Sequence, residues 1–353
     1  MPFPGSEFVQ RGDFTNVGEI GQGAYGKVYL ARDNMGRDVA VKEVLPSSEV
    51  VGEARVRFEK ESRIQARLEH PNIIRVYYLL KDSATDEWYL VCEFANGGSL
   101  ADYLEQHGKL SEELAIKIAL DISNALAEVW EGGIVHRDIK PSNILLARNA
   151  SGEITARLGD FGAAQDQQST RTTMFQGSSH PGTPMYMAPE QSNSANILDA
   201  RADIYALGIT LWEMLTTQDY KLLAQTGEPN LRKYNSDASG RVAKVIRAAV
   251  QNDPQQRYQT PADMTQDLKS VQQGKEPRIA MKSKKSTPQE GYYARRKWLW
   301  IVPVLIVLLL LGGGAYVLFG SGGNLPFVAQ APTATAIPPT AVPPTVVPPT
   351  ATI

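Results

Sequence analysis

Two short segments combine carboxylate, amide and basic side chains in a way that suits phosphate and metal chemistry. The first is His136-Arg137-Asp138-Ile139-Lys140 followed by Asn143, and the second is Asp160-Phe161-Gly162. Carboxylate and amide oxygens are the ligands that hard divalent cations prefer. A carboxylate beside an incoming hydroxyl can also orient it and accept its proton. Asp138, Asn143 and Asp160 are therefore candidate site residues, whereas His136 is interpreted as a packed core histidine.

A glycine-rich segment, Gly21-Gln-Gly23-Ala-Tyr-Gly26-Lys-Val28, lies near the start of the chain. Glycines let backbone N–H groups approach phosphates closely. The G-x-G-x-x-G pattern is a weak signal alone, because a dinucleotide-binding fold needs a helix to open at these glycines. Here the residues KVYLARD continue as a strand. The glycines are therefore predicted to lie in a hairpin that covers phosphates.

Lys42 ends the segment Val39-Ala-Val-Lys42, which reads as an alternating apolar strand. Its stem can pack while its amine reaches phosphate oxygens, and an exposed edge-strand lysine is the alternative. A buried ammonium needs a carboxylate partner. Glu61 on the following helix is the best candidate, because Glu59 points to a different face and Glu53 lies too near the helix start.

The elements that must position these residues change type along the chain. Residues 14–92 alternate apolar and polar side chains around turn signals, as strands do. They include one amphipathic helix over 53–69, which Pro71 stops. From residue 99 onward the pattern is helical, and Ser99 and Ser111 are predicted N-caps. A long helix follows Ser111 and reaches about Trp130, and further helices are predicted over 199–216, 241–252 and 260–273. The segment 218–239 is polar and irregular. A small β-rich lobe followed by a larger helical lobe is an α+β layout.

Composition and charge exclude several classes of protein. With 42% hydrophobic and 21% charged residues, the chain is neither wholly disordered nor collagen-like. The single cysteine, Cys92, cannot form an internal disulfide. The formal net charge of −2 argues against a dedicated nucleic-acid binder. That charge is unevenly distributed, because residues 275–297 carry eight Lys or Arg against two Glu and residues 298–353 carry no charged side chain.

The uncharged segment 298–319 is expected to cross a membrane. At about 1.5 Å rise per residue it would span roughly 33 Å, enough for a bilayer core. A buried core helix is the alternative, but such helices are rarely this long and apolar. All the positive charge lies on the N-terminal side of the span, so residues 1–297 are expected to face the cytoplasm. The Pro/Thr-rich residues that follow read as an extended stalk outside the membrane.

In their order and spacing, these motifs resemble the eukaryotic-type (Hanks-type) Ser/Thr protein kinase family, in its bacterial single-pass transmembrane kind. Ala188-Pro189-Glu190, residues 203–215 and Arg257 also match the family pattern. The resemblance implies a two-lobed protein kinase fold plus one transmembrane helix. The implied division is a kinase domain over 14–272, a basic juxtamembrane linker over 273–297, the transmembrane helix over 298–319 and an extracytoplasmic tail over 320–353.

The resemblance also implies ATP and Mg²⁺, with Mn²⁺ as an alternative, and Ser/Thr hydroxyls of proteins as substrates. Asp138 would be the catalytic base, Lys140 would stabilise the transferring phosphoryl group, and Lys42 would contact the α- and β-phosphates and pair with Glu61. Asn143 and Asp160 would hold the metal ion. The other nucleotide-contacting positions would be Gly21, Gly23, Gly26, Val28, Glu93 and Ala95, with Cys92 as a small buried residue behind the adenine.

Regulation and scaffold roles are implied in the same way. Arg137 beside Asp138 matches kinases controlled by a phosphorylated activation loop. The activation loop holds Thr172 and Thr173, which are the favoured phosphorylation sites, and also Thr170 and Ser169. The alternative is that these hydroxyls are not phosphorylated and only keep the loop soluble. Glu190 is expected to pair with Arg257, and Asp203 to anchor the backbone of the catalytic loop, which is the motif from His136 to Asn143. Gln65 departs from the family, which usually places an apolar residue there.

Three functions are compatible with the resemblance. The first is an active membrane-anchored Ser/Thr kinase, for which a homodimer would suit autophosphorylation between copies. The second is a catalytically silent kinase-like signalling scaffold, and the third is a small-molecule kinase. The lysine and both aspartates that silent relatives lose are present as Lys42, Asp138 and Asp160. Gly182-Thr183-Pro184 resembles a peptide-binding segment, so the first function is favoured.

Overall fold

The computed structural model describes residues 14–23, 26–43, 62–81, 88–166, 184–192, 198–224 and 230–278. Contacts divide the chain into two units, residues 1–283 and 284–353, and every described residue belongs to the first. Within those ranges no helix has both the length and the apolar character needed to cross a bilayer. The expected span over 298–319, the tail over 320–353 and the basic linker from residue 279 onward lie outside the described residues.

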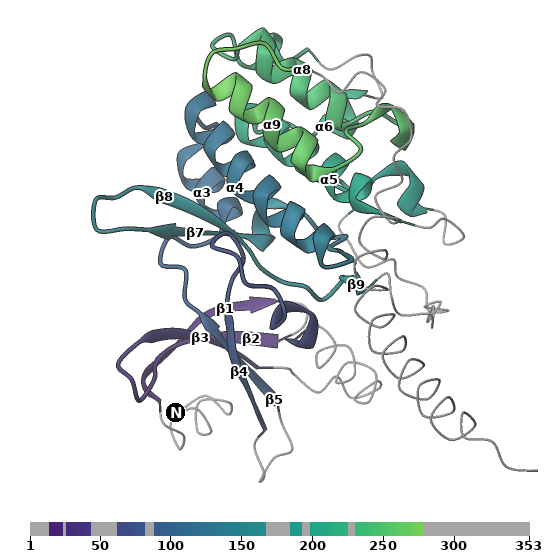
Figure 1. Cartoon of the computed structure of the whole chain (residues 1–353). Helices are drawn as coiled ribbons and strands as arrows, with labels where there is room; N and C mark the ends of the chain where they lie inside the picture. Colours follow the sequence, from purple (N-terminus) through teal and green to yellow (C-terminus); the bar gives the residue numbers. More distant parts are fainter. Residues whose placement is uncertain are drawn as a thin grey trace, which may run out of the picture. The chain divides into compact units, whose positions relative to one another are not determined.

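The N-terminal part is an antiparallel five-stranded sheet in the order β1-β2-β3-β5-β4. Its strands are β1 Thr15–Gly23, β2 Gly26–Arg32, β3 Asp38–Glu43, β4 Val76–Lys81 and β5 Trp88–Glu93. Figure 1 draws them in purple and blue. The short loops of β1–β2–β3 follow the turn signals in the sequence, so consecutive strands pair directly.

The two faces of this sheet have different roles, because side chains alternate along a strand. Val39 and Val41 of β3 are fully buried in a cluster with Tyr29, Tyr89 and others. Ala40 and Lys42 point to the opposite face, where Ala40 pairs with Cys92 and Lys42 with Leu90 in the register of β3 and β5. That second face carries Lys42 toward the C-terminal part of the chain.

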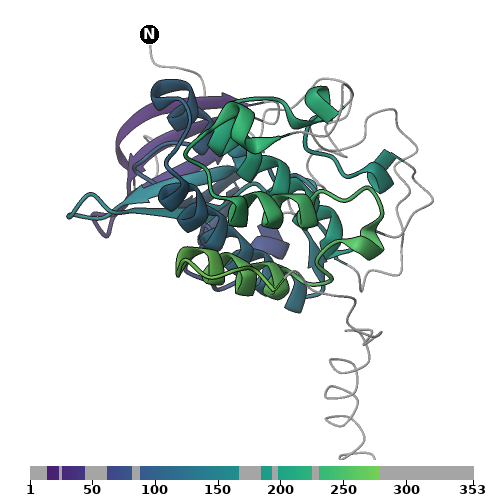
Figure 2. The ribbon, with the colours of Figure 1, turned by 90° about the horizontal axis from the view of Figure 1, so that it is seen from above.

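The C-terminal part is mainly helical. It contains α3 Leu100–His107, α4 Glu112–Glu131, α5 Ala200–Thr216, α6 Tyr220–Ala224, α7 Leu231–Tyr234, α8 Gly240–Ala249 and α9 Pro261–Gln272. Nearly every residue of α5 is buried, so this helix forms the centre of the apolar core. The helix α9 lies against α4 and α8 lies against α5 (Figures 1 and 2). The expected α+β layout with two lobes is confirmed.

Helix boundaries follow the capping residues closely. Ser99 caps α3 and Ser111 caps α4 through their side-chain oxygens, as predicted, and Asp199 and Thr260 cap α5 and α9. The helix predicted over 241–252 is α8, which ends at Ala249. It stops before Asp253, which caps the 3-10 turn Pro254–Gln256, and a residue that precedes proline is disfavoured in helical backbone. The helix predicted over 53–69 is described only from Ser62, and its helical backbone ends at Gln65.

Short elements between the sheet and the helices carry the candidate site. The strands β6 Ile134–Val135 and β9 Gln165–Asp166 form one antiparallel pair. The strands β7 Ile144–Arg148 and β8 Ile154–Leu158 form another. A 3-10 turn, η1 Pro141–Asn143, precedes β7, and a second, η2 Pro189–Ser192, follows the loop after β9. The loops after β6 and β8 lie close together, because the N–H of Gly159 donates to the carbonyl of Asn143.

Candidate active site

The loop between β6 and β7 is held in place by Asp203, in the first turn of α5. The carboxylate of Asp203, which is 2% exposed, accepts hydrogen bonds from the backbone N–H of His136 at 2.8 Å and of Arg137 at 2.7 Å. Asp203 therefore anchors the loop, as predicted. The backbone of Arg137 is left-handed, with φ of 71°, which a non-glycine residue adopts only when its surroundings impose it.

His136 is completely buried and joins the two candidate loops. Its Nδ1 accepts a hydrogen bond from the backbone N–H of Asp138, at 3.3 Å, so Nε2 carries the proton and donates to the carbonyl of Gly159, at 3.1 Å. Its ring also makes an edge contact with Phe161, with centroids 4.7 Å apart. These contacts confirm that His136 is a packed core histidine, and they hold Asp138 next to Asp160.

Asp138, Lys140 and Asn143 converge on one point. Oδ2 of Asp138 lies 2.8 Å from Nζ of Lys140 and accepts a hydrogen bond from Nδ2 of Asn143 at 2.9 Å. The same Asn143 amide donates to the carbonyl of Asp138 at 2.8 Å. The carboxylate of Asp138 is thus held in one orientation and keeps an exposed fraction of 15%. Such a fixed, accessible carboxylate can accept a proton from an incoming hydroxyl.

Asp160 follows β8 and meets Lys42 from the sheet. Oδ1 of Asp160 lies 3.3 Å from Nζ of Lys42, and the backbone N–H of Gly162 points to the same oxygen at 3.4 Å. Burial by itself raises the pKa of Asp160, but the attraction of Lys42 and these hydrogen bonds outweigh it, so its pKa lies below the ordinary value. Asp160 also has a left-handed backbone, with φ of 57°.

The glycine-rich segment forms the predicted hairpin between β1 and β2. Gly23 pairs with Gly26 and Gly21 with Val28, whereas Ala24 and Tyr25 lie outside the described residues. The φ of Gly26 is 149°, which favours glycine. Val28 also pairs with Lys42 across β2 and β3, so both side chains share one face of the sheet.

The segment after β5 connects the two parts of the fold. Cys92 of β5 and Ala95 just after it are buried in one small apolar cluster with Leu90 and Ile74, and Cys92 forms no disulfide. The side chain of Glu93 accepts a hydrogen bond from Nη1 of Arg157 on β8, at 2.6 Å. Gly97 then donates to the carbonyl of Leu146 on β7, at 2.7 Å. A Cβ on Gly97 would lie 2.6 Å from that oxygen, so this close approach requires glycine.

The side-chain oxygens of Asn143 and Asp160 are suitable ligands for a hard divalent cation that is bound together with phosphates. The backbone N–H of Gly159 donates to the carbonyl of Asn143 at 2.9 Å, which places the amide side chain and the ionised Asp160 on neighbouring backbone segments. Oxygen ligands of this kind suit Mg²⁺. Among the described residues no group of three or more His, Cys, Asp or Glu side chains could hold a metal by itself. Asn143 and Asp160 are thus the residues that would hold the ion.

Arg137, which belongs to the same loop as Asp138, has one guanidinium nitrogen without a partner in the described part of the chain. Its Nε is buried and has no hydrogen-bond partner among the described residues. Burial lowers the pKa of Arg137, and the nearby Asp203 opposes that effect only in part. The hydroxyl-bearing residues predicted to be phosphorylated, Ser169, Thr170, Thr172 and Thr173, lie outside the described residues.

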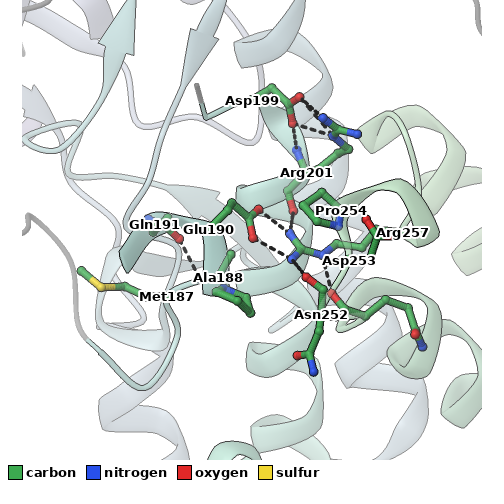
Figure 3. Close-up of polar contacts among 12 residues, drawn as sticks. Met187, Ala188, Glu190, Gln191, Asp199, Arg201, Asn252, Asp253, Pro254 and Arg257 are labelled. Carbon is green, nitrogen blue, oxygen red and sulfur yellow. Dashed lines mark hydrogen bonds and ion pairs between the residues drawn. The ribbon is translucent and has the colours of Figure 1, made fainter. Parts of the chain in front are cut away.

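Arg257 forms a buried ion pair with Glu190, as predicted (Figure 3). Its two terminal nitrogens lie 2.6 and 2.8 Å from the two carboxylate oxygens of Glu190, and its side chain is fully buried. The guanidinium also donates to three backbone carbonyls, those of Arg201, Gln251 and Asn252. Next to Glu190, Gln191 accepts from the N–H of Ala188 and donates to the carbonyl of Arg137 at 3.3 Å. This network attaches η2 to both α5 and the catalytic loop.

Two side chains whose contacts the sequence did not reveal hold the residues just before η2. The hydroxyl of Tyr186 donates to Glu213 of α5 at 2.6 Å. Nζ of Lys221 donates to the carbonyls of Pro184 and Met187 at 2.6 and 2.5 Å. Lys221 lies in the polar segment 218–239, which carries no motif, so no sequence signal could have identified it.

Beside these contacts the described residues form a pocket of about 480 Å³. Four parts of the chain line it. The catalytic loop contributes Lys140, Pro141 and Ser142, and the segment before η2 contributes Met185 and Tyr186. The helix α3 contributes Ala101, Leu104 and Glu105, and the C-terminal end of α5 contributes Glu213 and its C-cap Thr217. Because Lys140 contacts Asp138, the pocket opens directly next to the candidate catalytic carboxylate.

The structure thus brings together most of the residues singled out from the sequence. Asp138, Lys140 and Asn143 form one group, and Lys42 and Asp160 form another that the bond between Gly159 and Asn143 places beside it. Gly21, Gly23, Gly26 and Val28 lie on the hairpin next to Lys42, and Glu93 and Ala95 lie in the connection. Glu61 lies outside the described residues, so its pairing with Lys42 stays a prediction.

Comparison with known proteins agrees with this arrangement. The model of the family described as "Protein kinase domain" matches residues 14–278. The chain is 33% identical to the serine/threonine-protein kinase PknB of Mycolicibacterium smegmatis over 284 residues, which cover 75% of this chain and 44% of that protein. It is 34% identical to the serine/threonine-protein kinase PrkC of Bacillus subtilis over 265 residues, 71% of this chain and 39% of that protein.

The matched region spans less than half the length of these curated relatives. It nevertheless includes every described element that carries the candidate site, from the glycine hairpin to Arg257. The family match extends over most of the chain, and the residues that the match contains are the ones that the fold gathers around Asp138 and Asp160. The chain therefore belongs to the protein kinase domain family.

Proposed function

We propose that this chain is a serine/threonine protein kinase that transfers the γ-phosphate of ATP to Ser or Thr hydroxyls of proteins. The observation that carries the proposal is the fixed carboxylate of Asp138, held between Lys140 and Asn143 and adjacent to the Lys42–Asp160 pair. Phosphoryl transfer needs little covalent help from a protein, and catalysis rests on positioning and on charge stabilisation. This arrangement supplies both.

Each residue then has one task in the transfer. Asp138 orients the substrate hydroxyl and takes its proton as the hydroxyl oxygen bonds to the γ-phosphorus and the bond to the departing ADP oxygen breaks. Lys140 and Lys42 offset negative charge on the transferring group and on the α- and β-phosphates, respectively. Asn143 and Asp160 would hold Mg²⁺, which, when bound, neutralises phosphate charge. The glycine hairpin would cover the phosphates with backbone N–H groups.

The pocket beside Lys140 supports a protein substrate over a small molecule. It is open along the catalytic loop, the segment before η2 and the helices α3 and α5, so an extended peptide could lie across it with its hydroxyl at Asp138. Tyr186 and Lys221 hold the segment that would support such a peptide. The relatives carry the name serine/threonine-protein kinase, which supports Ser and Thr as acceptors.

The test is phosphate transfer from radiolabelled ATP by the full chain purified in detergent. We expect incorporation into the chain itself or into a generic basic protein, and none with Asp138→Asn. An unmodified chain that binds Mg²⁺–ATP but transfers nothing under any of these conditions would instead support the catalytically silent scaffold.

We further infer that activation-loop phosphorylation regulates the enzyme. The buried Nε of Arg137, without a described partner, supports this role because a phosphate could pair with it. Thr172 and Thr173 are the favoured sites, and a homodimer would allow each copy to modify the other. Mass spectrometry of the purified chain should find phosphate at one of them, and Arg137→Gln should remove the dependence of activity on that phosphate. Equal activity before and after phosphatase treatment would contradict this regulation.

We also propose that residues 298–319 anchor the kinase in the cell membrane with its catalytic part in the cytoplasm. The uncharged segment and the basic residues that precede it support this topology. The chain should remain in the membrane fraction after carbonate extraction, and deletion of residues 298–319 should release it. Protease added to intact cells should spare the kinase part. Release of the unmodified chain by carbonate would contradict the anchor.

A further inference from the structure

Gln65 places a buried amide where the family usually has an apolar side chain. It ends the described helical residues that begin at Ser62, and its side chain is 3% exposed. Its neighbours Ile64 and Leu68 are apolar and belong to the main core cluster. An amide at such a position is costly unless its polar atoms find partners. The partner therefore reveals what the residue does.

The amide nitrogen of Gln65 donates a hydrogen bond to the backbone carbonyl of Ile74, at 2.8 Å. Ile74 is also 3% exposed, so the bond is shielded from water. It joins the end of the helix to the chain segment that runs from Asn72 into β4. An apolar side chain would pack against the same segment without fixing the distance or the direction between the two backbones.

The other side of that segment is bonded to the strand that leads to Asp160. The N–H of Ile74 donates to the carbonyl of Leu158 at 2.9 Å, and the N–H of Leu158 donates to the carbonyl of Asn72 at 2.8 Å. The side-chain amide of Asn72 adds a bond to the carbonyl of Ala156 at 2.9 Å. Leu158 stands two residues before Asp160, so the segment 72–74 is bonded to the end of the strand that leads to the candidate metal ligand.

From these contacts we propose that Gln65 is a positioning residue for Mg²⁺–ATP. Its amide ties the helix to residues 72–74, and those residues set the position of Asp160 relative to Lys42. At this position the chain makes one directional hydrogen bond, whereas the apolar side chain that is usual in the family would make only a packing contact. This inference rests on the proposed kinase function, although nucleotide binding tests it separately.

Two substitutions and a matched control separate this role from simple stabilisation. Gln65→Leu removes the donor and leaves the carbonyl of Ile74 buried without it. Gln65→Glu can donate only when its carboxyl group is protonated, so its effect should depend on pH. Asn235→Asp is the control, because Asn235 is also buried and its amide donates to the carbonyl of Leu215 at 2.9 Å, between elements of the helical lobe.

The experiment measures the dissociation constant of Mg²⁺–ATP by calorimetry for the full chain in detergent, at pH 6 and pH 8, as a ratio to the unmodified chain. We expect Gln65→Leu to weaken binding about fivefold to tenfold at both pH values, the size expected when a buried acceptor loses its donor. Gln65→Glu should bind within about twofold of the unmodified chain at pH 6 and about fivefold more weakly at pH 8. Asn235→Asp should lower the melting temperature without changing the ratio.

The outcomes are separable from those of the kinase assay. Unchanged binding in Gln65→Leu, or a Gln65→Glu ratio that is the same at both pH values, overturns the positioning role. If Gln65→Leu does not fold, the pH dependence of Gln65→Glu alone decides. An unmodified chain that binds Mg²⁺–ATP but transfers no phosphate overturns the kinase function. The binding data for the variants then still decide whether Gln65 has the positioning role.

Discussion

Lys42 and Asp160 face each other with 3.3 Å between Nζ and Oδ1, although 118 residues separate them along the chain. Lys42 belongs to β3 of the sheet, and Asp160 follows β8 next to the helices. The pair therefore links the two lobes at the place where we propose that the phosphates lie. The amine also keeps the carboxylate ionised, which is the state that a metal ligand needs.

The first prediction concerns this pair. Lys42→Met should lower kcat/KM for ATP by about 100-fold, because a charge-assisted contact to the phosphates is lost. It should also raise the pKa of Asp160, whose value now lies below the ordinary 3.8. A depressed carboxyl pKa contributes stability above the ordinary value, and this contribution is lost as the pH falls through the folded-state value.

Urea unfolding between pH 3 and pH 7 tests the second part. The variant should be less stable than the unmodified chain by a constant amount above about pH 5, and the difference should shrink as both chains become protonated in acid. A difference that grows toward low pH would contradict this account of the pair.

The second prediction compares a buried ion pair with an exposed one. Arg257→Ala should lower the free energy of unfolding by about 3–5 kcal/mol, because it removes the buried guanidinium that pairs with Glu190 and donates to three backbone carbonyls. The control is Lys244→Ala, which breaks an ion pair to Glu276 at 2.7 Å whose side chains are 48% and 65% exposed. It should cost less than about 1 kcal/mol. Chemical denaturation measures both, and equal losses would refute the structural role of Arg257.

The third prediction is a pH effect at Glu213. Burial raises the pKa of Glu213, and the charge of Asp219 adds to this, whereas the hydrogen bond from Tyr186 opposes it. A raised pKa means that the associated stability is present below the ordinary value of 4.5 and is lost as the pH rises through the folded-state value. Glu213→Gln cannot ionise and still accepts from Tyr186.

We therefore expect Glu213→Gln to melt at a higher temperature than the unmodified chain at pH 7 and at nearly the same temperature near pH 4. Melting curves across that range check the prediction. A gap between the two chains that does not change with pH would show that ionisation of Glu213 is not the cause.

The fourth prediction tests the support of residues 184–187, on which we propose that a peptide substrate lies. Lys221→Met removes two hydrogen bonds to the carbonyls of Pro184 and Met187, so the segment should lose its fixed position. The KM for a peptide substrate should rise about threefold to tenfold, the usual range for such bonds, while the KM for ATP should not change. Lys233→Met, on the exposed face of α7, serves as the control. Steady-state kinetics with each substrate varied in turn would expose an equal effect on both KM values, which would argue against a local role.

The sequence predicted the local features of the fold and the composition of the site. Ser111, Asp199 and Thr260 start their helices where the patterns indicate, because capping depends on residues only a few positions apart. The positions of Asp138, Asn143 and Asp160 could be predicted because short motifs carry them. The pairing of Glu190 with Arg257 required the family resemblance, since no local signal links residues so far apart.

What the sequence could not supply are contacts between segments that carry no motif. Lys221 reaches the carbonyls of residues 184 and 187, and backbone carbonyls leave no trace in a sequence. The bond between Glu93 and Arg157 depends on how β8 packs beside the connection after β5. The sequence showed only that Gln65 departs from the family pattern. It could not show the hydrogen bond of Gln65, because the partner is again a backbone carbonyl.

The left-handed backbone of Arg137 and Asp160 has a consequence for protein engineering. Glycine adopts such a conformation at little cost, so Arg137→Gly and Asp160→Gly are substitutions that a search for thermostable variants would select on backbone grounds. Both would remove a side chain on which we expect catalysis or its control to depend. Stability and activity are therefore opposed at these two positions, and a stabilisation campaign for this chain should keep them fixed.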